Sequence, residues 1–172
     1  VYRQVAEFEI QDKYICHCSG ACTAEEAFPG IHAQGAYAIS IHLLFPISSK
    51  YNCWRELAGA FFCVEGDAQA VEVFVPLLRG LGLQVQTISP ESKAQYHLSC
   101  ALASNFVCAL VQRSAELLGS CGFSQTDALH ALAPLMRSNL AHVIEHGAVS
   151  ALTGPIERLS LIHISEPTRL QL

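Results

Sequence analysis

The sequence predicts an α/β fold in which a small sheet is followed by an all-helical C-terminal part. Up to residue 89, short apolar runs alternate with helical patterns and with turn residues, which is typical of βαβ units. Between residues 91 and 118 there is no glycine or proline, and the pattern is helical throughout. We therefore assign residues 1–89 to an α/β lobe and residues 90–158 to a helical domain.

Each element follows from local signals. Strands are expected at 14–18, 36–42, 60–64 and 83–88. Thr23 and Asp67 are helix caps, and the helix after Asp67 continues to about residue 81. A helix over 91–119 would be about 45 Å long. Another runs from 124 to about 146, and Pro134 is expected to bend or split it.

The composition indicates a partner surface. Only 15% of the residues are charged and 51% are hydrophobic, so much of the chain should be covered by a missing lobe or a second subunit. The helix between residues 98 and 110 is apolar nearly all the way round, which predicts burial on several sides. A net charge of −5 without a basic run favours neither nucleic acid nor a membrane surface, and no signal peptide is visible. We expect a cytoplasmic homodimer.

The eight cysteines are expected to be reduced core thiols, because no secretory signal is visible. Cys16, Cys18 and Cys22 lie close together, but their spacing does not fit the common zinc motifs. No metal site is predicted. A dinucleotide site needs a Gly-rich turn between a strand and a helix, and no G-x-G-x-x-G or P-loop is present.

The first candidate site is the end of the first strand, with His17, Ser19 and Gly20. Ligands bind at the carboxyl ends of strands in open α/β sheets. The alternative is a strand-end turn with a hydrogen-bonded histidine. His42 closes the second strand and is expected to line the same cleft, because neighbouring strands present their ends together; alternatively it is a polar residue at a strand exit.

The second candidate site lies on the long helix, with Tyr96, His97, Ser104 and Asn105. Positions 97, 101, 104, 105 and 108 share a helix face. Polar groups on an apolar helix need partners, so they mark either a substrate pocket or an interhelical hydrogen bond.

A third candidate is the loop Thr153-Gly154-Pro155 with Arg158. Its guanidinium is suited to a carboxylate or a phosphate. The alternative is a structural turn with a surface arginine.

Taken in order, these motifs resemble one family. The matching set is His17-x-Ser19-Gly20, His42-x-x-Phe45-Pro46, Glu65-Gly66-Asp67, Tyr96-His97 with Ser104-Asn105, and Ala151-Leu152-Thr153-Gly154-Pro155 with Arg158. It resembles Rossmann-like proteins whose C-terminal half is the domain of unknown function 2520. The similarity covers residues 5–158.

The resemblance implies that residues 1–89 are the remnant of a Rossmann-type NADP-binding lobe whose Gly-rich turn is missing here. It also implies kinship with pyrroline-5-carboxylate reductase, 6-phosphogluconate dehydrogenase and deazaflavin-dependent NADP reductases. Those relatives use a helical C-terminal domain for dimerisation and substrate binding. By position, His97 and Asn105 correspond to a catalytic polar pair, with His97 suited to proton transfer near neutral pH.

The sequence departs from this family at two places. His42 is followed by leucine instead of proline, and Arg158 is followed by Leu-Ser instead of Gly-Asp. Residues 161–169 resemble the translation of a sequencing adapter found at the ends of unrelated metagenomic proteins, so residues 159–172 are predicted to be an artefactual tail.

These observations favour a fragment of an NADP-dependent reductase or dehydrogenase that acts on a small molecule. On its own the fragment is expected to be inactive. The alternative is a non-catalytic, Rossmann-derived dimer that binds a ligand or regulates another protein.

Overall fold

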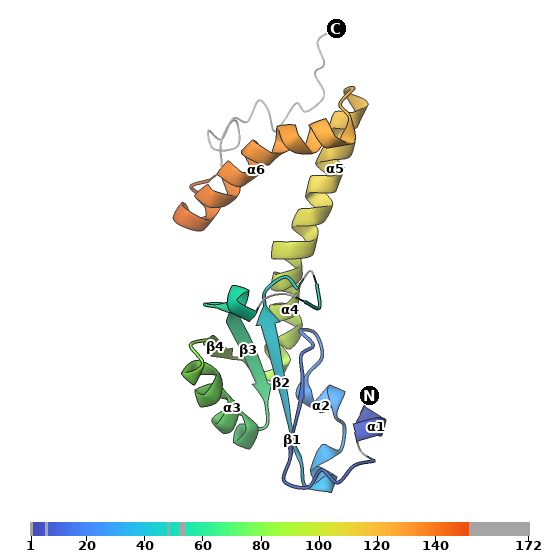
Figure 1. The fold of residues 1–172 in the computed structure, drawn as a ribbon, viewed down its shortest axis with the longest axis vertical. Coiled ribbons are helices and arrows are strands. Elements are labelled where there is room, and N and C mark those ends of the chain that lie inside the picture. Colours follow the sequence, from blue (N-terminus) through green and yellow to red (C-terminus); the bar gives the residue numbers. More distant parts are fainter. Residues whose placement is uncertain (1, 6, 48, 52–53, 152–172) are drawn as a thin grey trace. The chain divides into compact units, whose positions relative to one another are not determined.

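A four-stranded sheet organises the first part of the chain. The computed structural model describes residues 2–5, 7–47, 49–51 and 54–151. The strands β1 (Tyr14–His17), β2 (Tyr37–Leu44), β3 (Phe61–Gly66) and β4 (Gln84–Thr87) lie in this order across the sheet (Figure 1). β1 pairs with β2 and β3 with β4 in parallel, whereas β2 and β3 are antiparallel. The four predicted strands are confirmed, and β2 continues two residues past His42.

Short helices connect the parallel pairs. The short helix α2 (Ala24–Ala27) and the 3₁₀ turn η1 (Ile31–Gln34) join β1 to β2, and α3 (Ala68–Gly80) joins β3 to β4. Thr23 caps α2 in a reciprocal box with Glu26, as the sequence predicts. Asp67 precedes α3, but its carboxylate accepts a 2.6 Å hydrogen bond from the Ala38 N–H instead of capping the helix. Two further elements are α1 (Tyr2–Val5) and η2 (Trp54–Leu57).

The two faces of the sheet can be read from β2, because alternate residues of a strand point to opposite sides. Ile39 packs in the core cluster that includes residues of α3. Ala38 packs in a second cluster with residues of α2 and η1. Figure 1 shows α3 and α2 on opposite sides of the strands. Ser40 and His42 share the side of Ala38, so the polar end of β2 faces away from α3.

The helical part begins with one long helix built from consecutive segments. The turn η3 (Pro90–Ser92) leads into α4 (Lys93–Ala101), which continues through a π-helical segment, η4 (Leu102–Phe106), into α5 (Val107–Ser120). Helix α6 (Gln125–His146) follows, capped by the Ser124 hydroxyl, which accepts from the Asp127 N–H. Of the predicted bend or split at Pro134, the split is wrong, because α6 continues through this residue, and the bend stays a prediction.

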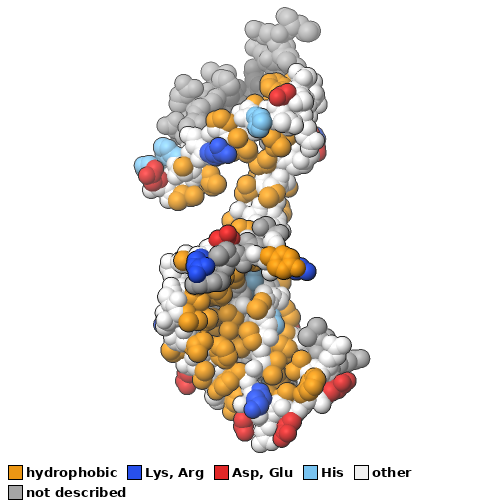
Figure 2. Space-filling view, in the orientation of Figure 1, with side chains coloured by type: hydrophobic (Ala, Val, Ile, Leu, Met, Phe, Trp, Pro, Cys, Tyr) orange, Lys and Arg blue, Asp and Glu red, His pale blue; other side chains and the backbone are white. Residues whose placement is uncertain are grey.

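The long helix is open over most of its apolar surface. Leu98, Leu102, Phe106 and Leu110 are 54%, 50%, 53% and 68% exposed, so the predicted burial on several sides is wrong within this chain (Figure 2). In the first unit, Lys93 at the start of α4 bonds Ser40 of β2, whereas Leu98, Leu102 and Phe106 further along stay exposed. By length and composition alone, the helical path Pro90–Ser120 would suffice to cross a membrane, a test that core helices of soluble proteins also pass.

The chain separates into two compact units, Val1–Val107 and Cys108–Leu172. The first unit holds the sheet, α4 and η4. In the second, Ala115 of α5 and Ala128 of α6 are buried. The sequence boundary at residue 90 marks the change from strands to helices, whereas the contacts divide the chain within the long helix. Thr153, Arg158 and the predicted tail at 159–172 lie outside the described residues.

Candidate functional site

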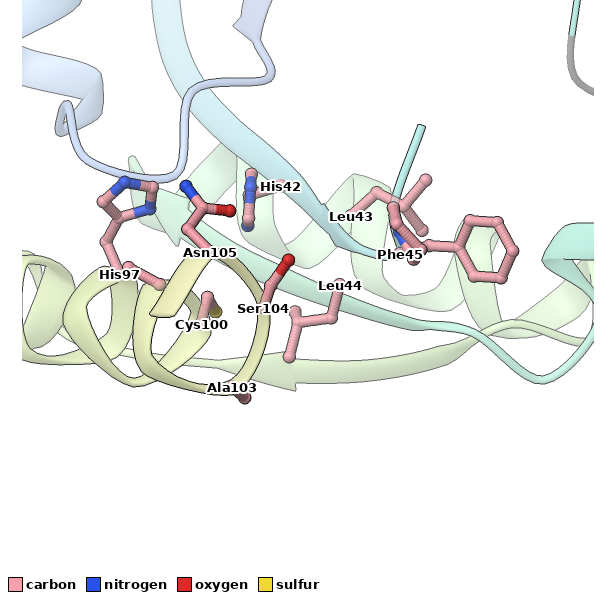
Figure 3. A pocket seen from close by; sticks show the side chains of 11 residues that line it. His42, Leu43, Leu44, Phe45, His97, Cys100, Ala103, Ser104 and Asn105 are labelled. Carbon is pink, nitrogen blue, oxygen red and sulfur yellow. The ribbon is translucent and has the colours of Figure 1, made fainter. Parts of the chain in front are cut away.

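A cleft of about 310 Å³ lies within the first unit, between the end of β2 and the long helix. Its β2 side consists of His42 and the apolar segment 43–46, and its helix side of residues from α4 and η4. Figure 3 shows these side chains from close by. The lining includes four of the predicted site residues, namely His42, His97, Ser104 and Asn105.

The π-helical segment shapes the helix side of this cleft. Ser104 and Asn105 lie within η4, where the wider helical turn changes the direction of the side chains relative to an α-helix. Positions 97, 101, 104 and 105 line the cleft, but Cys108, which α-helical spacing placed on the same face, does not. π-helical turns of this kind often occur at functional sites.

Two imidazole rings and one glycine meet at the inner end of the cleft. The ring centroids of His42 and His97 are 6.2 Å apart. A Cβ atom at Gly20 would lie 2.5 Å from His97 Nδ1 and 2.8 Å from His42 Nε2. His97 Nδ1 is buried and has no hydrogen-bond partner among the described groups. Only glycine therefore leaves room for both rings, and His97 Nδ1 packs against it without a partner among the described groups.

Replacing Gly20 with alanine should displace the two rings. A contact below 3 Å forces a shift, and the imidazoles move more easily than the backbone, so we expect at least a tenfold loss of ligand affinity or turnover with little loss of stability. Gly80→Ala is the matched control, because a Cβ there meets nothing within 4 Å. Chemical shifts of the His42 and His97 rings in the two variants measure the displacement. Unchanged ring signals in Gly20→Ala would contradict this packing.

His17 and Ser19 do not reach this cleft. They line a second pocket of about 650 Å³ beside β1 and α2, so the expectation that His17 and His42 share a cleft is wrong. The chain turns back after β1: the Ser19 N–H donates to His17 Nδ1, and the Cys22 N–H donates to the Ser19 hydroxyl. Burial lowers the pKa of His17, and its Nε2 is buried without a partner among the described groups.

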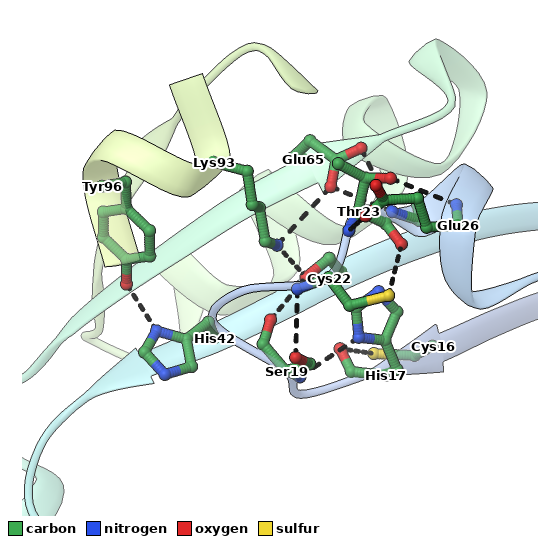
Figure 4. Close-up of polar contacts among 12 residues, drawn as sticks. Cys16, His17, Ser19, Cys22, Thr23, Glu26, His42, Glu65, Lys93 and Tyr96 are labelled. Atoms are coloured by element: carbon green, nitrogen blue, oxygen red, sulfur yellow. Dashed lines mark hydrogen bonds and ion pairs between the residues drawn. The ribbon is translucent and has the colours of Figure 1, made fainter. Parts of the chain in front are cut away.

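A buried polar network, absent from the sequence predictions, lies beneath the site (Figure 4). Lys93, the first residue of α4, is 2% exposed, and its ammonium bonds the Ser40 hydroxyl and lies 3.5 Å from a carboxylate oxygen of Glu65. The Glu65 carboxylate also accepts the Ala24 N–H at 3.1 Å. The Ser40 hydroxyl donates to the Ser19 carbonyl at 3.4 Å. The network thus ties α4 to β2, β3 and the turn that carries Gly20.

One sequence signal for this network existed. Lys93 precedes His97 by four residues and so shares its helix face. A lysine on the face that bears the site histidine needs an acidic partner if that face is buried. Glu65 is an acidic residue at the end of a buried strand. Its pairing with Lys93, 28 residues away in the sequence, cannot be predicted from local spacing.

The comparisons agree with this fold. Protein TM1727 from Thermotoga maritima superimposes with a TM-score of 0.74 at 24% identity, over 98% of this chain and 64% of its own length. A candidate NADP oxidoreductase from Bacteroides fragilis superimposes with a TM-score of 0.66 at 18% identity, over 91% of this chain and 57% of its own length. The reductive aminase from Aspergillus terreus, in complex with NADPH and ethyl-5-oxohexanoate, superimposes with a TM-score of 0.51 at 16% identity. The match covers 90% of this chain and 57% of the aminase. No curated protein matches the chain.

The sheet and the long helix that follows it thus define a Rossmann-like protein with the fold of oxidoreductases. A family model described as Domain of unknown function (DUF2520) matches residues 60–166, so the chain belongs to this family. Both the predicted fold class and the predicted family are confirmed. The match extends past Arg158, and the start of an artefactual tail at 159 stays a prediction. The chain spans less than two thirds of the length of each solved relative named above.

Proposed function

We propose that the chain is the substrate-side part of an NADP-dependent oxidoreductase that acts on a small carbonyl compound or imine. The observation that carries the proposal is the pair of histidines that line the cleft, His42 and His97. Their Nε2 and Nδ1 both approach Gly20, and His97 Nδ1 has no partner among the described groups. The amide of Asn105 lines the same cleft. A histidine near neutral pH exchanges a proton with a substrate oxygen or nitrogen, and an amide orients it.

The described residues do not provide a dinucleotide site. The only glycine in the turn after β1 is Gly20, which is buried beneath the two imidazoles. The amides of Ser19 and Cys22 in that turn are used within the turn itself. Pyrophosphate binding requires free backbone amides at a helix N-terminus. In this proposal the nucleotide is held by a Gly-rich segment outside the given sequence, in a longer cytoplasmic protein.

The walls of the cleft limit the substrate. Segment 43–46 and Cys100, Ala101 and Ala103 are apolar or weakly polar, and no described lining residue is Lys, Arg, Asp or Glu. Such a wall suits an uncharged group beside the reacting carbon. Thr153 and Arg158, which follow α6 in the sequence, stay proposed substrate ligands suited to an anionic group.

The function is tested with the complete protein, including the segment that precedes this chain. NADPH consumption is followed with a panel of small aldehydes, ketones and imines. Turnover of any member supports the proposal. NADPH binding without turnover, together with ligand binding in the cleft, would support the alternative of a Rossmann-derived regulatory dimer.

We also propose that the exposed apolar surface of α4, η4 and α5 is a homodimer interface. Leu110→Glu, at a position that is 68% exposed, should shift the protein to monomers, because charged groups are disfavoured at the centres of interfaces. Gln112→Glu, an exposed polar position on the same helix, is the matched control. Light scattering of both variants and the parent measures the mass. A monomeric parent contradicts the proposal. Sedimentation of the parent together with lipid vesicles would indicate that this surface binds a membrane instead.

A further inference from the structure

One hydrogen bond between α4 and β2 determines what His42 can do in the cleft. The Tyr96 hydroxyl and His42 Nδ1 lie 2.5 Å apart, with the two rings nearly perpendicular at 84° (Figure 4). Both side chains are partly buried. The bond can take two forms, since either the phenol O–H or the imidazole N–H donates. The form that is present decides which nitrogen of His42 carries the proton.

The surroundings of Tyr96 favour the phenol as the donor. The thiols of Cys63 and Cys100 are its other polar neighbours, and both contribute to the raised pKa of Tyr96. Burial raises the pKa of Tyr96 and that of Cys63, so both groups keep their protons at neutral pH. A thiol sulfur is a weak acceptor, whereas an imidazole nitrogen is a strong one. The phenol proton therefore goes to His42 Nδ1.

The surroundings of His42 keep its ring neutral. Burial lowers the pKa of His42, and the neighbouring His97 and Lys93 lower it further. Across the sheet His42 is paired with Cys63, whose thiol is protonated, and on α4 it faces Tyr96 and His97. None of these groups favours a positive charge on His42. A neutral imidazole has one proton, which must sit on the nitrogen that does not accept.

We infer that Tyr96 fixes His42 in the tautomer with its proton on Nε2, so that His42 presents a permanent N–H donor beside Gly20 and His97. Nε2 is the His42 nitrogen that approaches Gly20, and the His42 side chain lines the cleft, so the donor lies beside Gly20 at the edge of this cleft. Figure 3 shows the side chains of His42, His97 and Asn105 around this space. Tyr96 is then a positioning residue that acts through His42.

This inference deepens the proposed function and rests on it for the identity of the ligand. The two histidines have different tasks. His42 donates a fixed hydrogen bond to a substrate oxygen or nitrogen, and His97, whose Nδ1 has no partner in the described structure, is the proton-transfer group of the proposed function. A neutral N–H donor selects an uncharged carbonyl or imine over a protonated amine, which has no lone pair to accept.

The tautomer is measured on the chain itself, without cofactor or substrate. Long-range ¹H–¹⁵N spectra of the ¹⁵N-labelled protein report the protonation of each histidine nitrogen, and the signals that vanish in His42→Gln assign this residue. We expect a protonated Nε2 and an unprotonated Nδ1 at neutral pH. In Tyr96→Phe, which keeps the ring and loses the hydroxyl, both tautomers of His42 should appear. Tyr51→Phe, at a tyrosine that is 82% exposed, should leave the His42 signals unchanged.

A proton on Nδ1 in the parent protein would overturn the inference, as would an unchanged single tautomer in Tyr96→Phe. Unaltered signals of His17 and His32 show that Tyr96→Phe is still folded. The readout needs no turnover, so an inactive complete protein would refute the proposed function and leave the tautomer result standing. Turnover by a protein whose His42 carries its proton on Nδ1 would support the proposed function and refute the inference about the tautomer.

Discussion

Replacement of Lys93 with alanine is expected to lower the free energy of unfolding by about 3–5 kcal/mol, because it leaves a buried carboxylate without its counter-charge. Lys93 and Glu65 are 2% and 3% exposed, so water cannot solvate Glu65 when the ammonium is lost. The Ser40 hydroxyl also loses its Lys93 partner. Urea denaturation followed by circular dichroism measures the change.

Two further variants separate the ion pair from simple loss of volume. Lys13→Ala, at an exposed lysine, should change stability by no more than about 0.5 kcal/mol. The double variant Lys93→Met with Glu65→Leu removes both charges and should recover part of the loss, as buried pairs replaced by apolar residues often do. Recovery will be incomplete, since the Ala24 N–H then lacks its acceptor. A double variant less stable than Lys93→Ala would show that the charges are not the cause.

The features that the sequence predicted correctly are local ones. The strand and helix patterns around Thr23 and Asp67 depend on residues within one or two turns, and the elements occur where they are expected. His97 and Asn105 were found because polar groups on an apolar helix are unusual, and both line one cleft. His42 joins them because alternation along β2 puts its side chain on the side where Tyr96 and His97 of α4 lie.

The features that the sequence did not predict depend on distant contacts. The π-helical segment alters the helix faces around Ser104, and no single residue in it signals a wider turn. The role of Lys93 does not follow from the sequence pattern, because its partners, Ser40 and Glu65, lie on β2 and β3, far from it along the chain. The exposed surface of the long helix was expected to be covered, and the composition cannot tell whether the cover belongs to the same chain. The separate pocket of His17 follows from turn hydrogen bonds that a strand pattern does not contain.

Replacement of His97 with alanine in the complete protein is expected to reduce turnover by about 10²–10⁴-fold, the usual contribution of a positioned acid or base. NADPH affinity should be unchanged, because the dinucleotide is held by a different segment in the proposed function. His97 is suited to this role because its side chain lines the cleft and its Nδ1, which lies against Gly20, lacks a partner in the described structure.

His130→Ala provides the matched control, since His130 is an exposed histidine on α6. It should retain the parent rate. Added imidazole should restore part of the activity of His97→Ala, because a small base can enter the vacated volume, and it should not affect the control. Rescue distinguishes proton transfer from a packing role. If His97 only fills volume, a molecule of similar shape without a titrating nitrogen restores the activity equally well. An unchanged rate in His97→Ala would remove His97 from the chemistry and would leave His42 and Asn105 as ligand-binding groups of a non-catalytic protein.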